Sequence, residues 1–176
     1  SHTGGTTGKS LTTYYTWEDS RERMAILDAF RERFGWHLGA RTAWFSGKNI
    51  ITEREARRHH YWRTDRWFNI RYYSTFHITP ATAPYYIANL NRYAPLFITA
   101  FPSNVYELAR LAAQQDLAIE FTPKAVFSTA ETVTAEEEAV ITERFGCALA
   151  DQYASSEGAP FIVQCEHGRR HLLPAT

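Results

Sequence analysis

The chain has 176 residues, 44% of them hydrophobic, and its formal net charge is zero. This length and apolar content are typical of one globular domain, and they exclude a disordered tail or a polyelectrolyte. Basic residues exceed acidic ones in residues 1–100, and the reverse holds in residues 101–176. Such asymmetry could steer an anionic ligand toward the first half of the chain. We interpret it instead as surface charge without a functional role.

Two cysteines, Cys147 and Cys165, give no disulfide framework. Since no signal-peptide pattern is recognised either, we expect a reducing, cytoplasmic setting. No apolar run approaches the roughly 18 residues that span a bilayer, so membrane insertion is not expected. The sequence opens on Ser1 rather than on methionine, and we expect an internal part of a longer protein.

The first half of the chain alternates helical and β-prone segments. Thr16 and Asp19 have the spacing of a helix cap, and Gly35 would end the helix that follows. Thr79-Pro80 is a plausible start for a later helix. The predicted elements are a helix over 17–34, a strand over 41–46, an Arg-rich helix over 53–66, a strand over 69–76 and a helix over 80–93.

The second half is more regular. Strand, helix, strand, helix and strand are predicted over 96–101, 102–115, 125–128, 134–145 and 147–153, with Thr134 capping the second helix and Gly146 ending it. Gly168 then lies in a turn between short strands at 161–165 and 171–173, as in a hairpin. The alternation predicts right-handed βαβ units, and therefore an α/β fold with a mainly parallel sheet flanked by helices.

The opening segment SHTGGTTGKS has the composition of an anion-binding loop. Glycines let backbone N–H groups converge on a phosphate, while threonine hydroxyls and Lys9 add donors and charge. A P-loop of the NTPase type needs four residues between its first glycine and Gly-Lys-Ser, but only three separate Gly4 from Gly8. A flexible linker is the alternative interpretation.

A second polar segment, DQYASSEGAPF (151–161), follows the last predicted parallel strand. Ligands bind at the carboxyl ends of such strands. Tyr153 offers a face for a purine, the serines offer donors to a phosphate, and Glu157 is a hard oxygen ligand for Mg²⁺. The alternative is an ordinary strand exit with a solvated glutamate.

Together these segments resemble the phosphate loop and the Tyr-Gly-x-Thr/Ser-Glu motif of adenylate-forming ligases. Ser128-Thr129-Ala130-Glu131 resembles the family's Thr-Ser-Gly-Glu turn, although a helix-capping turn is compatible with it. Segments STFHITP (74–80), AFPSNVYELA (100–109) and 127–165 are similar to the phenylacetate–CoA ligase and CapK-like capsule-biosynthesis branch. Ser10, Ala130 and Ala154 depart from the family's Pro, Gly and Gly.

The resemblance implies that residues 1–176 are part of an AMP-binding (adenylation) domain, without the small C-terminal domain. It implies ATP-dependent activation of a small-molecule carboxylate to an acyl-adenylate, followed by thioester formation with CoA. A non-catalytic nucleotide- or anion-binding module is the alternative. Without the rest of its own chain, the fragment is expected to be inactive.

The family motifs assign roles to residues. Lys9, Ser156 and Glu157 are the predicted catalytic residues, Glu157 being also the Mg²⁺ ligand. The predicted phosphate and adenine contacts are Thr3, Gly4, Gly5, Thr6, Thr7, Gly8, Lys9, Ser128, Thr129, Ala130, Glu131, Tyr153, Ala154, Ser155 and Ser156. Phe76 and His77 would lie near the acyl pocket, although a packed, hydrogen-bonded histidine is equally compatible with the sequence.

Two weaker patterns remain. Cys165, His167 and His171 offer a thiol and two imidazoles to Zn²⁺, but their spacing matches no standard zinc knuckle. The arginines and aromatic residues of 54–67 are a pattern found in nucleic-acid binding. Because the chain is neutral and arginine stems also cover aromatic surface, we expect no nucleic-acid partner.

Overall fold

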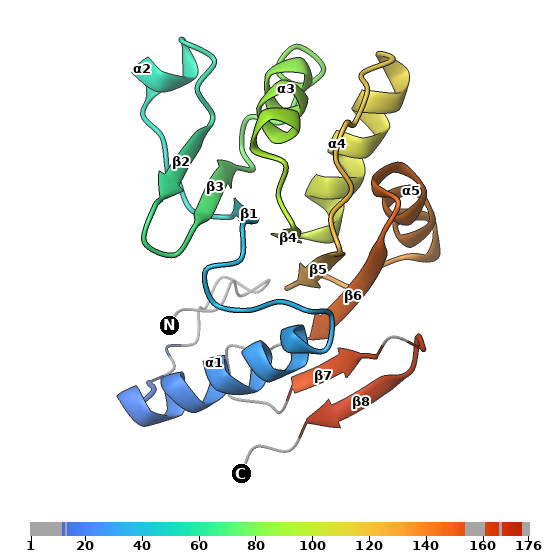
Figure 1. Cartoon of the computed structure of the whole chain (residues 1–176). Helices are drawn as coiled ribbons and strands as arrows, with labels where there is room; N and C mark the ends of the chain where they lie inside the picture. Colours follow the sequence, from blue (N-terminus) through green and yellow to red (C-terminus); the bar gives the residue numbers. More distant parts are fainter. Residues whose placement is uncertain (1–11, 13, 154–160, 166, 174–176) are drawn as a thin grey trace.

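An eight-stranded mixed sheet with helices on both faces forms the centre of the computed structural model, which describes residues 12, 14–153, 161–165 and 167–173 (Figure 1). The strands are β1 (Thr42–Ser46), β2 (Trp62–Asp65), β3 (Ile70–Ser74), β4 (Phe97–Ala100), β5 (Ala125–Thr129), β6 (Ala148–Tyr153), β7 (Phe161–Gln164) and β8 (Arg170–Leu173). The helices are α1 (Trp17–Glu32), α2 (Glu53–Ala56), α3 (Ala83–Tyr93), α4 (Pro102–Gln114) and α5 (Ala135–Phe145).

The strand order is β2-β3-β1-β4-β5-β6-β7-β8. The five central strands, β3 through β6 in this order, run parallel, whereas β2, β7 and β8 pair antiparallel at the two ends. The α/β prediction is therefore confirmed. The β7–β8 hairpin is confirmed as well, with Gly168 in a left-handed conformation at its turn.

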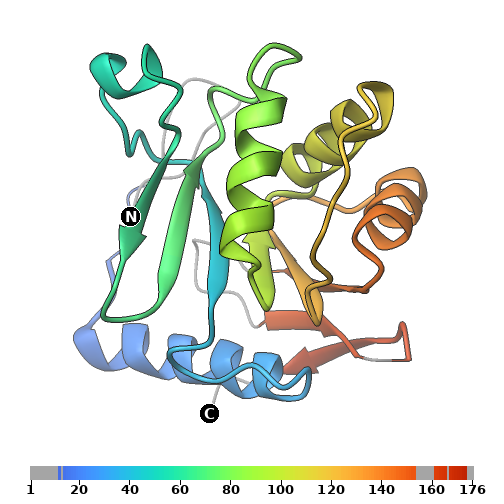
Figure 2. The same cartoon turned by 45° about the horizontal axis from the view of Figure 1, so that its top comes forward.

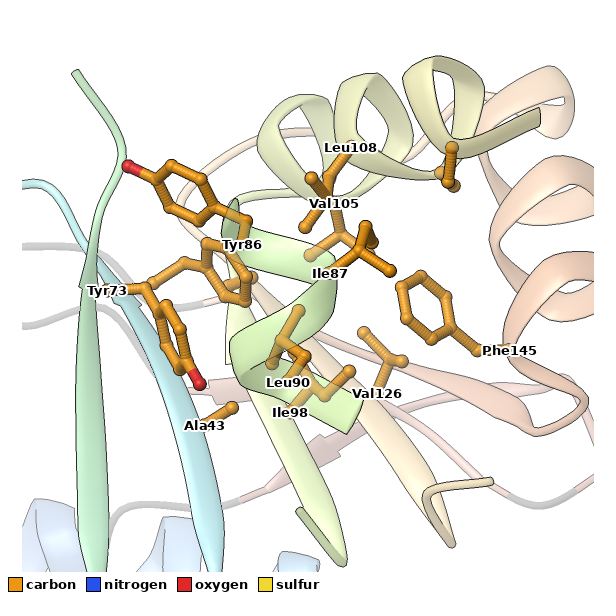
Figure 3. Close-up of a cluster of buried hydrophobic side chains, with 14 of the residues drawn as sticks. Ala43, Tyr73, Tyr86, Ile87, Leu90, Ile98, Val105, Leu108, Val126 and Phe145 are labelled. Carbon is orange, nitrogen blue, oxygen red and sulfur yellow. The ribbon is translucent and has the colours of Figure 1, made fainter. Parts of the chain in front are cut away.

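Two hydrophobic clusters hold the layers together. One face of the sheet is covered by α3, α4 and α5 (Figure 2), and Figure 3 shows Leu90, Val105 and Phe145 converging on Ile98 and Val126 of the central strands. The other face is covered by α1. These clusters arise because alternate residues of each buried strand point to opposite faces.

Local capping signals place two helix starts correctly. Thr16 and Asp19 form a capping box at α1, and Thr134 and Glu137 form another at α5. Gly146 then ends α5 with a φ of +64°, in the left-handed conformation that glycine adopts without strain. The helix expected over 17–34 ends slightly earlier, at Glu32.

The helix predicted over 53–66 is wrong. Its first turn alone is helical, as α2, and His59 then takes a φ of +56°, which reverses the chain. Residues 62–65 form β2 and pair antiparallel with β3. The aromatic residues of this segment favour β structure, and packing at the sheet edge stabilises them more than a solvent-exposed helix rich in arginine would.

The start of the helix predicted over 80–93 is also wrong. Pro80 precedes α3, which begins at Ala83 with Thr82 as its N-cap residue. The Thr82 hydroxyl is occupied by the carbonyls of His77 and Thr79 instead of capping the helix. Among all described residues, no helix is long and apolar enough to cross a bilayer.

Candidate functional site

The two nucleotide motifs that the structure describes lie at the same edge of the sheet. Ser128 and Thr129 end β5, Ala130 and Glu131 follow it, and Tyr153 ends the neighbouring parallel strand β6. Ser128 pairs in register with Asp151, so the two strand tips are adjacent. Ligands of open parallel sheets bind at this carboxyl edge.

A small hollow of about 140 Å³ lies at these two strand tips. Its lining residues are Glu131, Thr132, Asp151, Tyr153, Ile162 and Arg170. The hollow therefore brings together Glu131 and Tyr153, two of the predicted adenine contacts, although they are separated by more than twenty residues. Tyr153 is 55% exposed, which leaves its ring accessible for stacking.

Asp151 is the buried carboxylate of the hollow, and two side chains contact it. Its Oδ1 accepts a hydrogen bond from the Ser128 hydroxyl at 2.8 Å, and its Oδ2 lies 3.3 Å from the Arg170 guanidinium. The Asp151 side chain is only 11% exposed, whereas that of Arg170 is 61% exposed. Ser128, a predicted nucleotide contact, thus positions a neighbouring carboxylate and is itself almost fully buried.

The turn after β5 has the conformation of a glycine turn. Ala130 takes a φ of +65°, in the left-handed region that L-residues adopt at a cost. The turn directs the Glu131 carboxylate toward the start of α4, where it accepts the Ser103 N–H at 3.2 Å. A negative charge is favourable there because the first amides of a helix lack internal partners.

The phosphate-loop residues 3–10 and residues 154–157 lie outside the described part of the chain. This applies to all three predicted catalytic residues: Lys9, Ser156 and Glu157. It also applies to the remaining predicted contacts Thr3, Gly4, Gly5, Thr6, Thr7, Gly8, Ala154 and Ser155. Their roles stay predictions.

The smaller buried cluster, under α1, contains residues that adjoin two of the three motif segments. Phe30, on the helix after the loop, lies 6.3 Å from the ring of Phe127, which precedes Ser128. Phe161, directly after the second motif, belongs to the same buried cluster, and the Arg23 guanidinium of α1 lies 4.5 Å from its ring. This cluster therefore joins α1 to the strands β5 and β7 on one face of the sheet.

A second hollow, of about 280 Å³, lies further along the carboxyl edge. His77 lines it, together with Asn49, Ile51, Thr52, Glu53, Ala56 and Arg57. The His77 Nδ1 lies 2.8 Å from the Ser74 hydroxyl, and its ring stacks on Tyr61. His77 is thus both packed and part of a hollow, whereas Phe76 is 64% exposed and is not among the lining residues.

The zinc alternative is not supported. In the regions that the structure describes, no three His, Cys, Asp or Glu side chains are placed to hold a metal ion. Cys165 is buried, whereas His167 in the turn and His171 on β8 are exposed. Both cysteines are free thiols, as the sequence predicts.

Sequence reasoning missed Asp151 and Arg170. Asp151 carried a usable signal, because a carboxylate inside a buried strand is unfavourable unless it has partners. Arg170 carried none, because only the antiparallel return of β8 brings it to the tip of β6.

Comparison with solved structures identifies the class of fold. The chain superposes on an open 2-hydroxyisobutyryl-CoA ligase in complex with 2-HIB-AMP and CoA, with a TM-score of 0.66 and 14% identity over 98% of this chain and 40% of that one. An anthranilate CoA ligase in complex with anthranoyl-AMP gives a TM-score of 0.56 and 14% identity over 96% and 31% of the two chains. The fold is that of AMP-forming CoA ligases.

The sequence comparison is more specific. The chain is a homologue of Protein CapK from Staphylococcus aureus, with 33% identity over 174 residues. The alignment covers 99% of this chain but 38% of CapK, so the chain spans well under half the length of its relative. No family model matches the sequence. The resemblance inferred from the motifs is confirmed.

Proposed function

We propose that this chain forms the ATP-binding part of an AMP-forming acid–thiol ligase. A substrate carboxylate oxygen attacks the α-phosphorus of ATP, the bond to the β-phosphate oxygen breaks, and pyrophosphate leaves. The sulfur of a thiol then attacks the acyl carbon, AMP leaves, and a thioester forms. CoA is the proposed thiol, because the 2-hydroxyisobutyryl-CoA ligase with the same fold was crystallised with CoA.

The observation that carries the proposal is the hollow between the tips of β5 and β6. It contains the Tyr153 ring and the Glu131 carboxylate at the carboxyl edge of a parallel sheet, where open α/β sheets bind ligands. An anthranilate CoA ligase of the same fold was solved in complex with anthranoyl-AMP. The hydrophobic cluster that joins α1 to Phe127 and Phe161 supports it further, because it fixes the residues directly before Ser128 and at the end of segment 151–161.

The proposed roles are those that the family motifs imply, and the chemistry of the side chains supports them. Thr6, Thr7, Gly8 and Lys9 would hold the leaving pyrophosphate, and Ser156 would donate to the α-phosphate. Glu157 would hold Mg²⁺, which neutralises phosphate oxygens and is typically bound by one or two carboxylates together with those oxygens. Tyr153 would stack on adenine. Catalysis would then rest on positioning and charge neutralisation rather than on a protein nucleophile.

His77 defines the proposed acid-binding end. The ends of β3 and β6 are four strand spacings apart, roughly 19 Å. An acyl-adenylate would lie across the intervening tips of β1, β4 and β5, with its acyl group toward the His77 hollow. The exposed Phe76 has no contact that supports a role in this hollow.

The test is carboxylate-dependent ATP–pyrophosphate exchange with a panel of acids. It is measured on this chain and on a polypeptide that extends it to the length of its relatives. We expect exchange and AMP release from the longer protein, and little or no turnover from the 176 residues. Glu157→Gln should lower exchange by about 100-fold or more, as expected for lost transition-state charge stabilisation. Glu120→Gln removes an exposed carboxylate far from the motifs and serves as the control.

Two outcomes would contradict the proposal: release of ADP instead of AMP, or no exchange with any acid. The second would favour a non-catalytic nucleotide- or anion-binding module. Departures from the family pattern at Ser10, Ala130 and Ala154 are the observation that favours this module. Ala130 is the weakest of them, because its backbone already has the left-handed conformation of the glycine that it replaces.

A further inference from the structure

The segment that was predicted as a long arginine helix forms an open basic hollow instead. Its volume is about 400 Å³, and it is lined by Thr52, Arg54, Glu55, Arg58 and Arg63. The hollow shares Thr52 with the His77 hollow, so the two lie on either side of α2. Neither the ligase motifs nor the proposed residue roles use these arginines.

One of the three arginines is fixed in place. The Arg63 Nε donates to the Ile50 carbonyl at 2.7 Å, and one of its terminal nitrogens lies 2.9 Å from the Glu55 Oε1 and 3.0 Å from the Oε2. Glu55 also accepts the Thr52 N–H and hydroxyl at the start of α2. These contacts keep the pKa of Glu55 below its usual value, chiefly through the hydrogen bonds from Thr52. Glu55, the single carboxylate among the lining residues, is therefore already paired with Arg63 and Thr52.

The other two arginines have no such match. Within the described chain, the guanidinium groups of Arg54 and Arg58 have no hydrogen-bond or ion-pair partner, and both side chains are exposed. Neighbouring Glu53 does not neutralise them, because its carboxylate lies 3.3 Å from Arg57. Arg54, Arg58 and Arg63 against Glu55 leave an excess of two positive charges in one hollow.

We propose that this hollow binds the phosphomonoester of the thiol co-substrate, that is, the 3′-phosphate of CoA. Two unpaired guanidinium forks match the charge and the planar donor geometry that a phosphate dianion requires. The hollow shares Thr52 with the His77 hollow at the β2–β3 end of the sheet, so the phosphate would anchor the outer end of CoA while the pantetheine arm extends its thiol toward the acyl carbon. This inference rests on the proposed function, because it takes CoA as the acceptor.

The experiment compares CoA with dephospho-CoA, which lacks only this phosphate. Binding of each to the 176-residue chain is measured by calorimetry at low and at physiological salt, for the native sequence and for Arg54→Gln/Arg58→Gln. We expect the double variant to weaken CoA binding by about tenfold and to leave dephospho-CoA binding unchanged. Added salt should weaken CoA binding by the native chain more than by the variant. Arg54→Lys/Arg58→Lys should retain part of the affinity, because the charge remains.

Arg92→Gln is the matched control, because it removes an exposed arginine from the last turn of α3, away from the hollow. Equal affinity for CoA and dephospho-CoA would overturn the inference, as would no binding of either nucleotide or an equal loss in the Arg92 variant.

The longer protein separates this inference from the proposed function. Normal ATP–pyrophosphate exchange with an unchanged KM for CoA in the double variant would refute the phosphate site alone. No exchange with any acid would refute the ligase, whereas the difference between CoA and dephospho-CoA is still read directly from binding.

Discussion

The hydrogen bond between Ser128 and Asp151 should contribute measurably to the stability of the candidate nucleotide edge. Ser128→Ala removes the hydroxyl that donates at 2.8 Å to a carboxylate whose side chain is 11% exposed. Hydrogen bonds to charged groups contribute about 1.5–3 kcal/mol, more than bonds between neutral groups. The remaining partner, Arg170 at 3.3 Å, is mostly exposed and compensates only weakly.

We therefore expect Ser128→Ala to lower the free energy of unfolding by about 1.5–3 kcal/mol. For a chain of this length the loss corresponds to a fall in Tm of about 3–12 °C. Urea unfolding followed by circular dichroism measures the free energy, and a thermal scan measures Tm. Arg170→Gln should cost only about 0–1 kcal/mol, because exposed ion pairs are screened by water and salt.

A double-mutant cycle with Asp151→Ala isolates the pair. We expect the double variant to be more stable than the sum of the single changes implies, with a coupling of about 1 kcal/mol or more. A loss below about 0.5 kcal/mol for Ser128→Ala, or an equal loss for Arg170→Gln, would refute the assignment of the stronger bond to the buried partner.

Three further changes test other parts of the argument. Ala130→Gly should raise the free energy of unfolding, measured in urea, by up to about 1 kcal/mol. The change relieves roughly 1–2 kcal/mol of left-handed strain, and glycine's added unfolded-state entropy offsets about 0.4–1 kcal/mol of this gain. Ala139→Gly, inside α5, should instead lower the free energy of unfolding, and a lower value for both variants would contradict the strain at Ala130. Burial raises the pKa of the Cys147 thiol from its ordinary 9.0 to about 12. In a Cys165→Ala background we therefore expect iodoacetamide to label Cys147 at pH 8 about a thousandfold more slowly in the native chain than in denaturant, because only the thiolate reacts. The free energy of unfolding should also fall as pH rises from 9 toward 12, because the thiol ionises more readily in the unfolded chain. Phe127→Ala should cost about 3–5 kcal/mol in urea unfolding, because this fully buried ring joins α1 to β5, and a loss below about 1 kcal/mol would show that the two are held together otherwise.

Much of the fold was predictable because its signals are local. The capping boxes at Thr16 and Thr134 need only residues three apart, and Gly146 needs only its own freedom at positive φ. The buried strands β4 and β5 are short apolar runs with helices between them, a pattern that fits few arrangements other than a parallel sheet. The sheet order itself required the long-range pairing of β1 between β3 and β4.

In the candidate site, the sequence predicts only those residues that belong to a recognisable motif. Glu131 and Tyr153 were predicted from segments that end strands, and the structure places both in one hollow. Arg170 reaches that hollow from a hairpin whose register depends on tertiary pairing, so no local pattern in the sequence announces it. Asp151 differs, because a carboxylate in a buried strand is itself a signal that partners must exist.

The failed helix over 53–66 shows how a misprediction and a binding site arise from the same physics. Arginines at 54, 57 and 58 fit a solvated helical face, and a straight helix would have spread them along one exposed stripe. The left-handed turn at His59 ends the helix after one turn and returns the chain as β2, so that Arg63 lies across from Arg54 and Arg58. Repulsion among these charges opposes that arrangement, and Glu55 offsets only part of it. An arrangement of charge that costs stability and breaks the local rule is expected where a ligand supplies the missing countercharge.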